Sequence, residues 1–100
     1  MIDFERISGF EWDAGNARKS AAKHGVTQAE AEQVFLNEPL LVSADIKHSR
    51  TEPRFHVLGR THEDRWLHVT FTLRGDDTLI RIISVRDMHR KERVIYEKAP

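Results

Sequence analysis

Residues 65–74 read RWLHVTFTLR, and this stretch decides the fold. An apolar stripe alternates here with a second set of residues: Leu67, Val69, Phe71 and Leu73 on one parity, and Trp66, His68, Thr70 and Thr72 on the other. This is the period of a β-strand with one buried and one wet face. The strand therefore predicts a sheet with one apolar side, and other elements must cover that side.

The segments on either side of this stretch also read as strands. Phe55–Arg60 alternates before it, and Leu79–Val85 follows it with apolar residues on both parities at all but two positions. Turns as short as His62–Asp64 and Gly75–Asp77 join antiparallel neighbours. We therefore predict an antiparallel sheet in which Leu79–Val85 is a central strand.

Helix signals lie in the first forty residues and at the C-terminal end. Gly25 is the C′ residue of a first helix that Asp13 caps, and residues 27–30 read TQAE, a capping box that begins a second. The predicted helices cover Ala14–His24, about 27–37, and Asp87–Lys98.

The order of these elements predicts the fold class. A short strand over Ile7–Trp12 precedes the helices, and Leu40–Thr51 shows no clear period. The apolar stripe must be buried, so we predict a two-layer α+β fold. Its antiparallel sheet carries the two helices of the N-terminal half on one face, together with a C-terminal helix. The length of 100 residues predicts one domain over residues 1–100.

Composition excludes several classes of protein. The chain has no cysteine, which excludes disulfide scaffolds, thiol nucleophiles and thiolate metal sites. It has no apolar run of about 18 residues, and Met1–Trp12 lacks the apolar run of a secretory signal, so we expect a cytoplasmic protein with no membrane partner. The formal net charge is +0, but the last twenty residues hold six basic and three acidic side chains.

Six histidines invite a metal-site hypothesis. His56, His62 and His68 are evenly spaced, but no His-Glu-x-x-His pair and no thiolate completes a ligand set. We therefore expect neither a metal nor another cofactor.

Polar side chains follow the predicted wet face of the sheet, where an antiparallel sheet needs no functional explanation for them. Arg81 is different, because a guanidinium within an apolar strand needs an anionic partner or a wet groove. Arg86, Arg90 and Arg93 share one face if the terminal helix begins early enough. These arginines predict a phosphate-binding groove.

Motifs over residues 10–96 resemble the BrnT family in their order and spacing. They are FEWD at 10–13, KHG at 23–25, VF at 34–35, RF at 54–55, FT at 71–72, IRIISVR at 80–86, ER at 92–93, and Tyr96. The resemblance implies a RelE-like fold and a ribonuclease toxin of a type II toxin–antitoxin pair that stops translation. It also implies a BrnA-like ribbon-helix-helix antitoxin in a complex of two toxins and two antitoxins. That complex represses its own operon, so the toxin meets operator DNA only through the antitoxin.

The resemblance also implies site residues, because the RelE-like group cleaves RNA without a metal. Arg86 and Tyr96 match catalytic positions of that group, Arg65 resembles the arginine of the preceding strand, and Arg81 belongs to the BrnT motif. Arg65 shares the parity of the apolar stripe, which aims it towards the core unless it lies at a frayed strand end. The neutral charge of the chain departs from the strongly basic toxins of the group.

Metal-free RNA cleavage needs a base for the ribose 2′-hydroxyl, positive charge at the phosphate and an acid for the leaving 5′-oxygen. Arginine suits the second task, because its guanidinium pairs bidentately with phosphate and stays charged. Tyr96 or His68 would act as base or acid, and the sequence does not choose between them. Tyr96 would alternatively serve as an amphipathic cap on the sheet. The charge-stabilising candidates are Arg65, Arg81 and Arg86, and the candidate RNA-binding residues are Arg54, His56, Arg74 and Arg93.

Two other functions fit the same sequence. A toxin of this fold would act on a protein target, as ParE toxins act on gyrase, and its arginines would then lie in an interface. A non-enzymatic module would only hold its antitoxin. RNA degradation by the purified protein distinguishes a ribonuclease from both.

Overall fold

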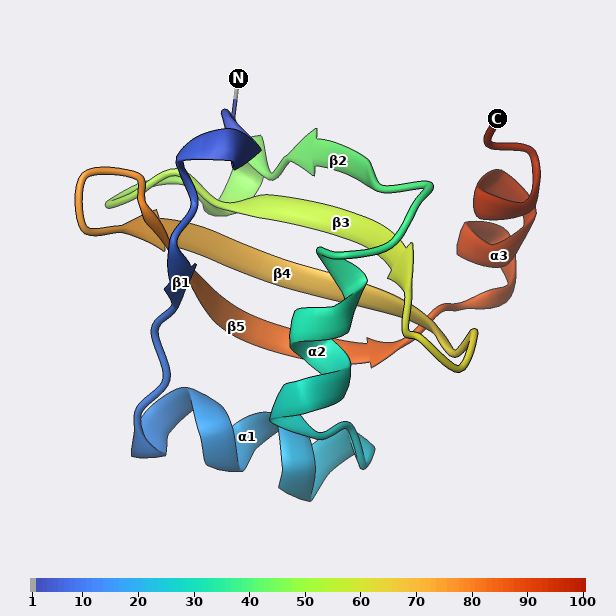
Figure 1. Ribbon diagram of the computed structural model, residues 1–100, viewed down its shortest axis with the longest axis horizontal. Helices are drawn as coiled ribbons and strands as arrows, with labels where there is room; N and C mark the ends of the chain where they lie inside the picture. The colour runs from blue at the N-terminus through green and yellow to red at the C-terminus, as the bar shows by residue number, and fades with distance from the viewer. Residues whose placement is uncertain (1) are drawn as a thin grey trace.

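The computed structural model describes residues 2–100, apart from the side chains at 19–23. In this part of the chain a five-stranded sheet has the order β1-β5-β4-β3-β2 (Figure 1). The strands are β1 (Gly9–Phe10), β2 (Leu41–Ala44), β3 (Phe55–Arg60), β4 (Trp66–Arg74) and β5 (Leu79–Asp87). The helices are α1 (Ala14–His24), α2 (Gln28–Val34) and α3 (Arg90–Glu97), and single 3-10 turns lie at Phe4–Arg6 and Ile46–His48.

The predicted strands β3, β4 and β5 are confirmed as antiparallel neighbours. β1 is shorter than Ile7–Trp12 and pairs with β5 in parallel. β2 lies within the segment that shows no clear period in the sequence. It is an edge strand whose side chains are half-buried or exposed, so it lacks the alternation that marks a strand with one buried face. β5 runs on to Asp87, which pairs with Leu67, so α3 begins at Arg90 and not at Asp87 as predicted.

α2 covers the face of the sheet that carries the apolar stripe. Its Ala31 and Val34 are buried in one cluster with Val57 and Val69. The helix approaches β3 closely at Gly59, where a Cβ atom would lie 2.6 Å from Val34 Cγ1. The capping box predicted at its start is present, because the Thr27 side chain and the Glu30 side chain each accept a hydrogen bond from the other's backbone N–H.

α1 lies against β5, and the prediction that both early helices pack on one face is right only for α2 (Figure 1). The buried amide of Asn16 donates to the Ile82 carbonyl at 2.9 Å and to the Glu11 carbonyl at 3.0 Å. The helix therefore satisfies a carbonyl on the edge of β5 beyond its short pairing with β1. The helix ends before Gly25, whose φ of 63° is that of the predicted C′ glycine.

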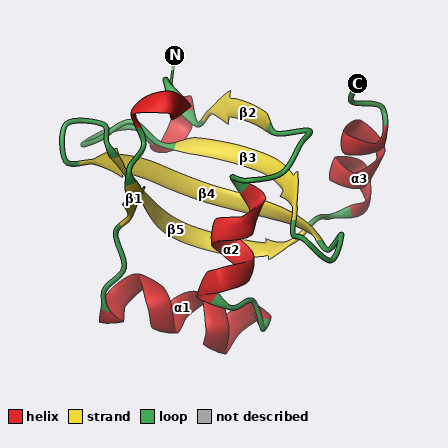
Figure 2. Ribbon diagram, in the orientation of Figure 1, coloured by secondary structure: helices red, strands yellow, loops and turns green. Residues whose placement is uncertain are grey.

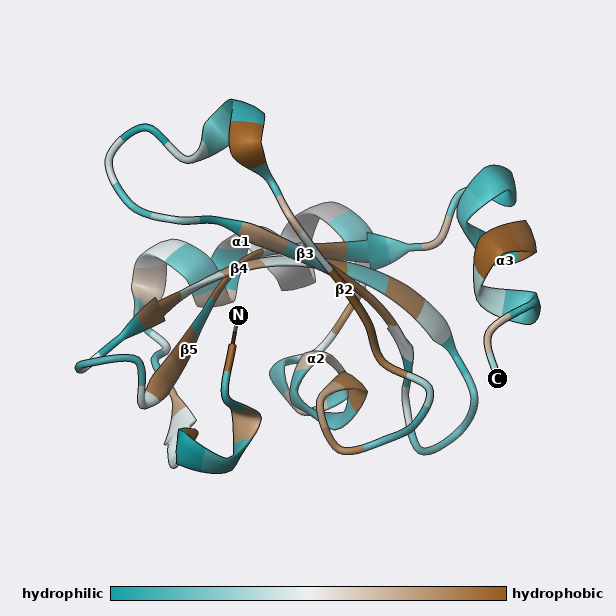
Figure 3. Ribbon diagram, turned by 90° about the horizontal axis from the view of Figure 1, so that it is seen from above, coloured by the Kyte–Doolittle hydropathy of each residue, from teal (hydrophilic) through white to brown (hydrophobic). Residues whose placement is uncertain are grey.

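The face of the sheet opposite α2 is the open face. Figure 3, turned by 90°, shows α2 on one side of the sheet, and Figure 2 shows α3 beside one end of the strands. α3 is fixed at this end by Tyr96, which is 3% exposed and packs edge-on against Trp66 with ring centroids 4.8 Å apart. No helix among residues 2–100 combines the length and apolar character that crossing a bilayer requires.

Candidate functional site

The strand register places two rows of side chains on the open face. Val57 and Val69 point into the core, so the residues that alternate with them point the other way. Directly paired residues form these rows, which are Leu41, Leu58, His68 and Arg86 in one and Ser43, His56, Thr70 and Ser84 in the other. The first row therefore joins an apolar end on β2 and β3 to a guanidinium on β5.

Arg86, Glu92 and His68 meet where α3 begins. The Arg86 guanidinium donates two hydrogen bonds to the Glu92 carboxylate, at 2.7 and 2.9 Å. Glu92 Oε1 also accepts from the His89 backbone N–H at 2.8 Å, which holds the carboxylate in place. His68 Nε2 lies 3.9 Å from Glu92 Oε2, too far for a hydrogen bond but close enough for charge to act.

The protonation of these groups follows from their surroundings. Burial lowers the pKa of His68 from 6.5 to about 4, and the positive charge of Arg86 acts in the same direction while Glu92 opposes it. The hydrogen bond from Arg86 lowers the pKa of Glu92 to about 2. At neutral pH the site therefore holds a neutral imidazole, which is a weak base, beside an ion pair.

His56 is held in one orientation on the neighbouring strand. Its Nε2 lies 3.0 Å from Asp45 Oδ2, and its Nδ1 lies 3.0 Å from the Thr70 hydroxyl. Asp45 is buried and also contacts His48 Nδ1 at 3.0 Å. The rings of His56 and His68 lie 4.9 Å apart, so this network supports the ring of His68 from one side. Both ring nitrogens of His56 are therefore occupied by contacts within the protein.

Arg74 and Arg81 form a separate cluster with carboxylates. Arg81 contacts Asp13 at 3.0 Å and Glu11 at 3.1 Å, and Arg74 contacts Glu52 at 3.1 Å. The hydrogen bond from Arg81 lowers the pKa of Asp13. Arg81 thus finds anionic partners inside the protein, which is one of the two solutions that its position in the strand required.

Arg65 lies away from the open face. Its guanidinium makes a two-bond pair with Asp87 at 2.8 and 3.0 Å, and NH1 donates to Glu30 and to the Gly25 carbonyl at 3.1 Å each. Because Arg65 lies before the first residue of β4, its side chain reaches the loop between α1 and α2 and not the core. The structure therefore places Arg65 as a link between the helices and the end of β5.

Tyr96 is also directed away from Arg86 and His68. Its hydroxyl donates to the Pro39 carbonyl at 2.6 Å, and burial raises its pKa. Tyr96 is thus buried between Trp66 and the Pro39 carbonyl, and the alternative role as a cap fits these contacts. Arg93 lies 4.8 Å from the Trp66 ring centroid in a cation–π contact. Arg54 precedes β3, and its carbonyl accepts from the Asp45 N–H.

The sequence prediction missed two acidic members of the site. Glu92 was recognised only as part of a motif, although its place three residues after His89 is that of a helix-capping carboxylate. Asp45 lies in the segment without a period, where Asp-x-x-His at the start of a 3-10 turn is the only local signal.

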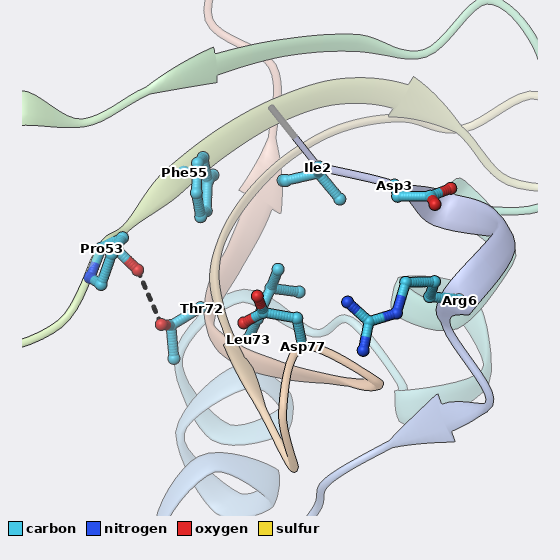
Figure 4. Close-up of a pocket in the computed structure, with 8 residues that line it drawn as sticks. All are labelled: Ile2, Asp3, Arg6, Pro53, Phe55, Thr72, Leu73 and Asp77. Atoms are coloured by element: carbon cyan, nitrogen blue, oxygen red, sulfur yellow. Dashed lines mark hydrogen bonds between the residues drawn. The ribbon is translucent and has the colours of Figure 1, made fainter.

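Two cavities where a ligand could bind differ in their lining residues. One, of about 360 Å³, lies on the open face between β2, β3, β4 and α3, and His56, His68 and Glu92 are among its lining residues. The other, of about 280 Å³, lies between the N-terminal turn and the Gly75–Asp77 end of the sheet (Figure 4). None of the predicted site residues lines the second cavity, so the first marks the candidate site. Among residues 2–100, no three side chains of the metal-ligating types converge as a metal site would require.

Comparison with known proteins shows the family of this chain. Residues 12–92 match the model of a family described as ribonuclease toxin, BrnT, of type II toxin-antitoxin system. The chain belongs to the BrnT family. Family membership predicted from the sequence is thus confirmed, and it makes this BrnT-family protein a ribonuclease toxin with an antitoxin partner.

A solved structure shares the fold of this BrnT-family chain. The crystal structure of the Brucella abortus ribonuclease toxin BrnT is similar with a TM-score of 0.59 and 20% sequence identity, over 82% of this chain and 97% of that chain. The likeness confirms the α+β fold. No curated protein sequence matches the chain.

Proposed function

We propose that this BrnT-family toxin cleaves RNA on its open face without a metal ion, with His68 as the proton acceptor and Arg86 as the phosphate-binding group. The observation that carries the proposal is the direct pairing of His68 with Arg86 across β4 and β5. Neighbouring strands lie about 4.8 Å apart, so the two side chains reach one phosphodiester from adjacent positions.

The proposed reaction uses the neutral form of His68. Its ring accepts the proton of the ribose 2′-hydroxyl, and the 2′-oxygen forms a bond to phosphorus. The bond from phosphorus to the 5′-oxygen breaks as a water molecule from the solvent protonates the leaving oxygen, and the hydroxide that remains takes the proton from the His68 ring. Arg86 stabilises the charge that develops on the phosphate oxygens. The products are a 2′,3′-cyclic phosphate and a 5′-hydroxyl end.

The internal ion pairs bear on the affinity of this toxin, which has no net charge, for an anionic RNA. Arg86 is bound to Glu92, so a phosphate must compete with that carboxylate for the guanidinium. Arg65, Arg74 and Arg81 are likewise paired with carboxylates. We therefore expect weak binding of the general RNA backbone, with a salt dependence of about one phosphate contact and not many.

The test is cleavage of an end-labelled RNA by purified protein in excess chelator. Wild type and Arg50→Ala, which changes an exposed arginine, should cleave equally. Arg86→Ala and His68→Gln should each lose about 100-fold to 1,000-fold in rate. Activity that disappears with chelator and returns with Mg²⁺ would overturn the metal-free mechanism.

We also propose the finer details of the partner. The antitoxin is a BrnA-like ribbon-helix-helix protein that forms a complex of two toxins and two antitoxins and contacts operator DNA, and the toxin has the RelE-like variant of the α+β fold. The family assignment and the C-terminal helix beside an antiparallel sheet support these statements. Light scattering of the co-expressed pair would measure the stoichiometry. Operator binding by the toxin alone would contradict the proposal.

A further inference from the structure

The cavity on the open face continues the row that ends at Arg86. Leu41 and Leu58, paired across β2 and β3, lie at the other end of that row, and Ile95 of α3 completes an apolar wall. Ser43 adds a hydroxyl from β2. The volume of about 360 Å³ lies at the small end of the range of about 300–1,000 Å³ for ligand pockets, which is suited to a single ring system.

The polar side chains that line the cavity are of two kinds: some already make hydrogen bonds within the protein, and others are left for a ligand. Both oxygens of Glu92 accept hydrogen bonds from Arg86, and both ring nitrogens of His56 contact other side chains. Ser43 and His68 are the polar lining residues left to contact a bound ligand. A nucleobase has this combination of properties, because its faces pack on apolar and aromatic groups while its edge needs hydrogen bonds.

The order of groups along the row also matches that of a nucleotide. The apolar wall at Leu58 is two strands away from Arg86, about 10 Å, and His68 lies between them. In an RNA chain the ribose with its 2′-hydroxyl lies between a base and the phosphate on its 3′ side. A base against Leu58 and a phosphate at Arg86 would therefore bring the 2′-hydroxyl to His68.

From this order we infer that the cavity bounded by Leu41, Leu58, Ser43 and Ile95 binds the nucleobase on the 5′ side of the cleaved phosphodiester. The inference rests on the proposed function, and it names the part of the RNA that this site reads. The apolar walls bind the faces of one base, and Ser43 reads its edge.

The matched variants are Ile95→Ala and Val94→Ala. Both residues are apolar and exposed on α3, at 57% and 46%, but only Ile95 lines the cavity. Cleavage sites of each protein are mapped on an RNA of mixed sequence. Wild type and Val94→Ala should show the same base preference immediately 5′ of the cut. Ile95→Ala should lose about tenfold in kcat/KM on the preferred site and flatten that preference.

A binding measurement separates this inference from the proposed function. The four nucleoside 3′-monophosphates are titrated into wild-type protein while the methyl signals of Leu58 and Ile95 are followed by NMR. Shifts of these methyls by one or two of the nucleotides would support the base site even if the protein cleaved no RNA. Two results together would overturn the base site and leave the proposed function standing. Ile95→Ala would cleave RNA with the base preference on the 5′ side unchanged, and none of the nucleotides would shift the methyl signals. A variant that keeps its preference but escapes neutralisation by the antitoxin would assign the cavity to the partner protein and also overturn the inference.

Discussion

Arg86 near the end of β5 donates two hydrogen bonds, of 2.7 and 2.9 Å, to the Glu92 carboxylate in the first turn of α3. This ion pair joins the helix to the sheet beside His68. It also occupies the guanidinium that we propose binds phosphate, so Glu92 stabilises the fold and competes with phosphate for Arg86.

Replacing Glu92 tests the stabilising role of the ion pair. Glu92→Gln should lower the free energy of unfolding at pH 7 by about 1–2 kcal/mol, because a charge-assisted pair becomes a neutral one. The folded-state pKa of about 2 lies below the ordinary value of 4.5, so the stabilisation is present above pH 4.5 and is lost as pH falls towards 2. Glu97→Gln, which changes an exposed carboxylate on the same helix, should leave the pH dependence unchanged in urea unfolding. Equal acid sensitivity of Glu92→Gln and wild type would contradict the role of the pair.

The pH dependence of cleavage follows from His68. Its pKa of about 4 keeps the imidazole neutral down to acidic pH, so the acid limb of kcat/KM should lie near pH 4 and not near 6.5. Assay of kcat/KM between pH 3.5 and 8 measures the limb, and the His68 ring signals followed by NMR give its titration directly. A limb near 6.5, with His68 itself titrating near 4, would show that another group accepts the proton.

Arg65 should prove to be a stability residue. Arg65→Ala removes the contacts that join Asp87, Glu30 and the Gly25 carbonyl, and we expect a loss of about 1–3 kcal/mol. Arg65→Lys, which keeps the charge without the two-bond geometry, should recover part of this loss. Thermal unfolding measures both. A variant that is as stable as wild type and unable to cleave RNA would restore the catalytic assignment made from the family resemblance.

Tyr96→Phe should lower stability and retain activity. The substitution leaves the Pro39 carbonyl without its donor at 2.6 Å and keeps the packing on Trp66, so a loss of about 1–2 kcal/mol is expected. Cleavage per folded molecule should equal that of wild type at a temperature well below unfolding. Loss of cleavage without loss of stability would show that the hydroxyl acts in the reaction.

Local pattern was enough to predict most of the secondary structure. The alternation in β4, the capping box of α2 and the glycine after α1 each involve only a few neighbouring residues, so these signals do not depend on tertiary contacts. The edge strand β2 carried no such signal, because its side chains are nowhere fully buried.

By itself the sequence determined the family, the strands at the centre of the sheet and the types of residue available for chemistry. Only the tertiary structure decided which arginines are paired away from His68, because the partners of Arg65 and Arg81 come from distant parts of the chain. Arg81 meets Asp13 from 68 positions away and Arg65 meets Glu30 from 35, and no local period records such pairs. A charge is satisfied by whatever opposite charge folding brings within about 4 Å, so the same residue type serves phosphate binding at one place and structural pairing at another.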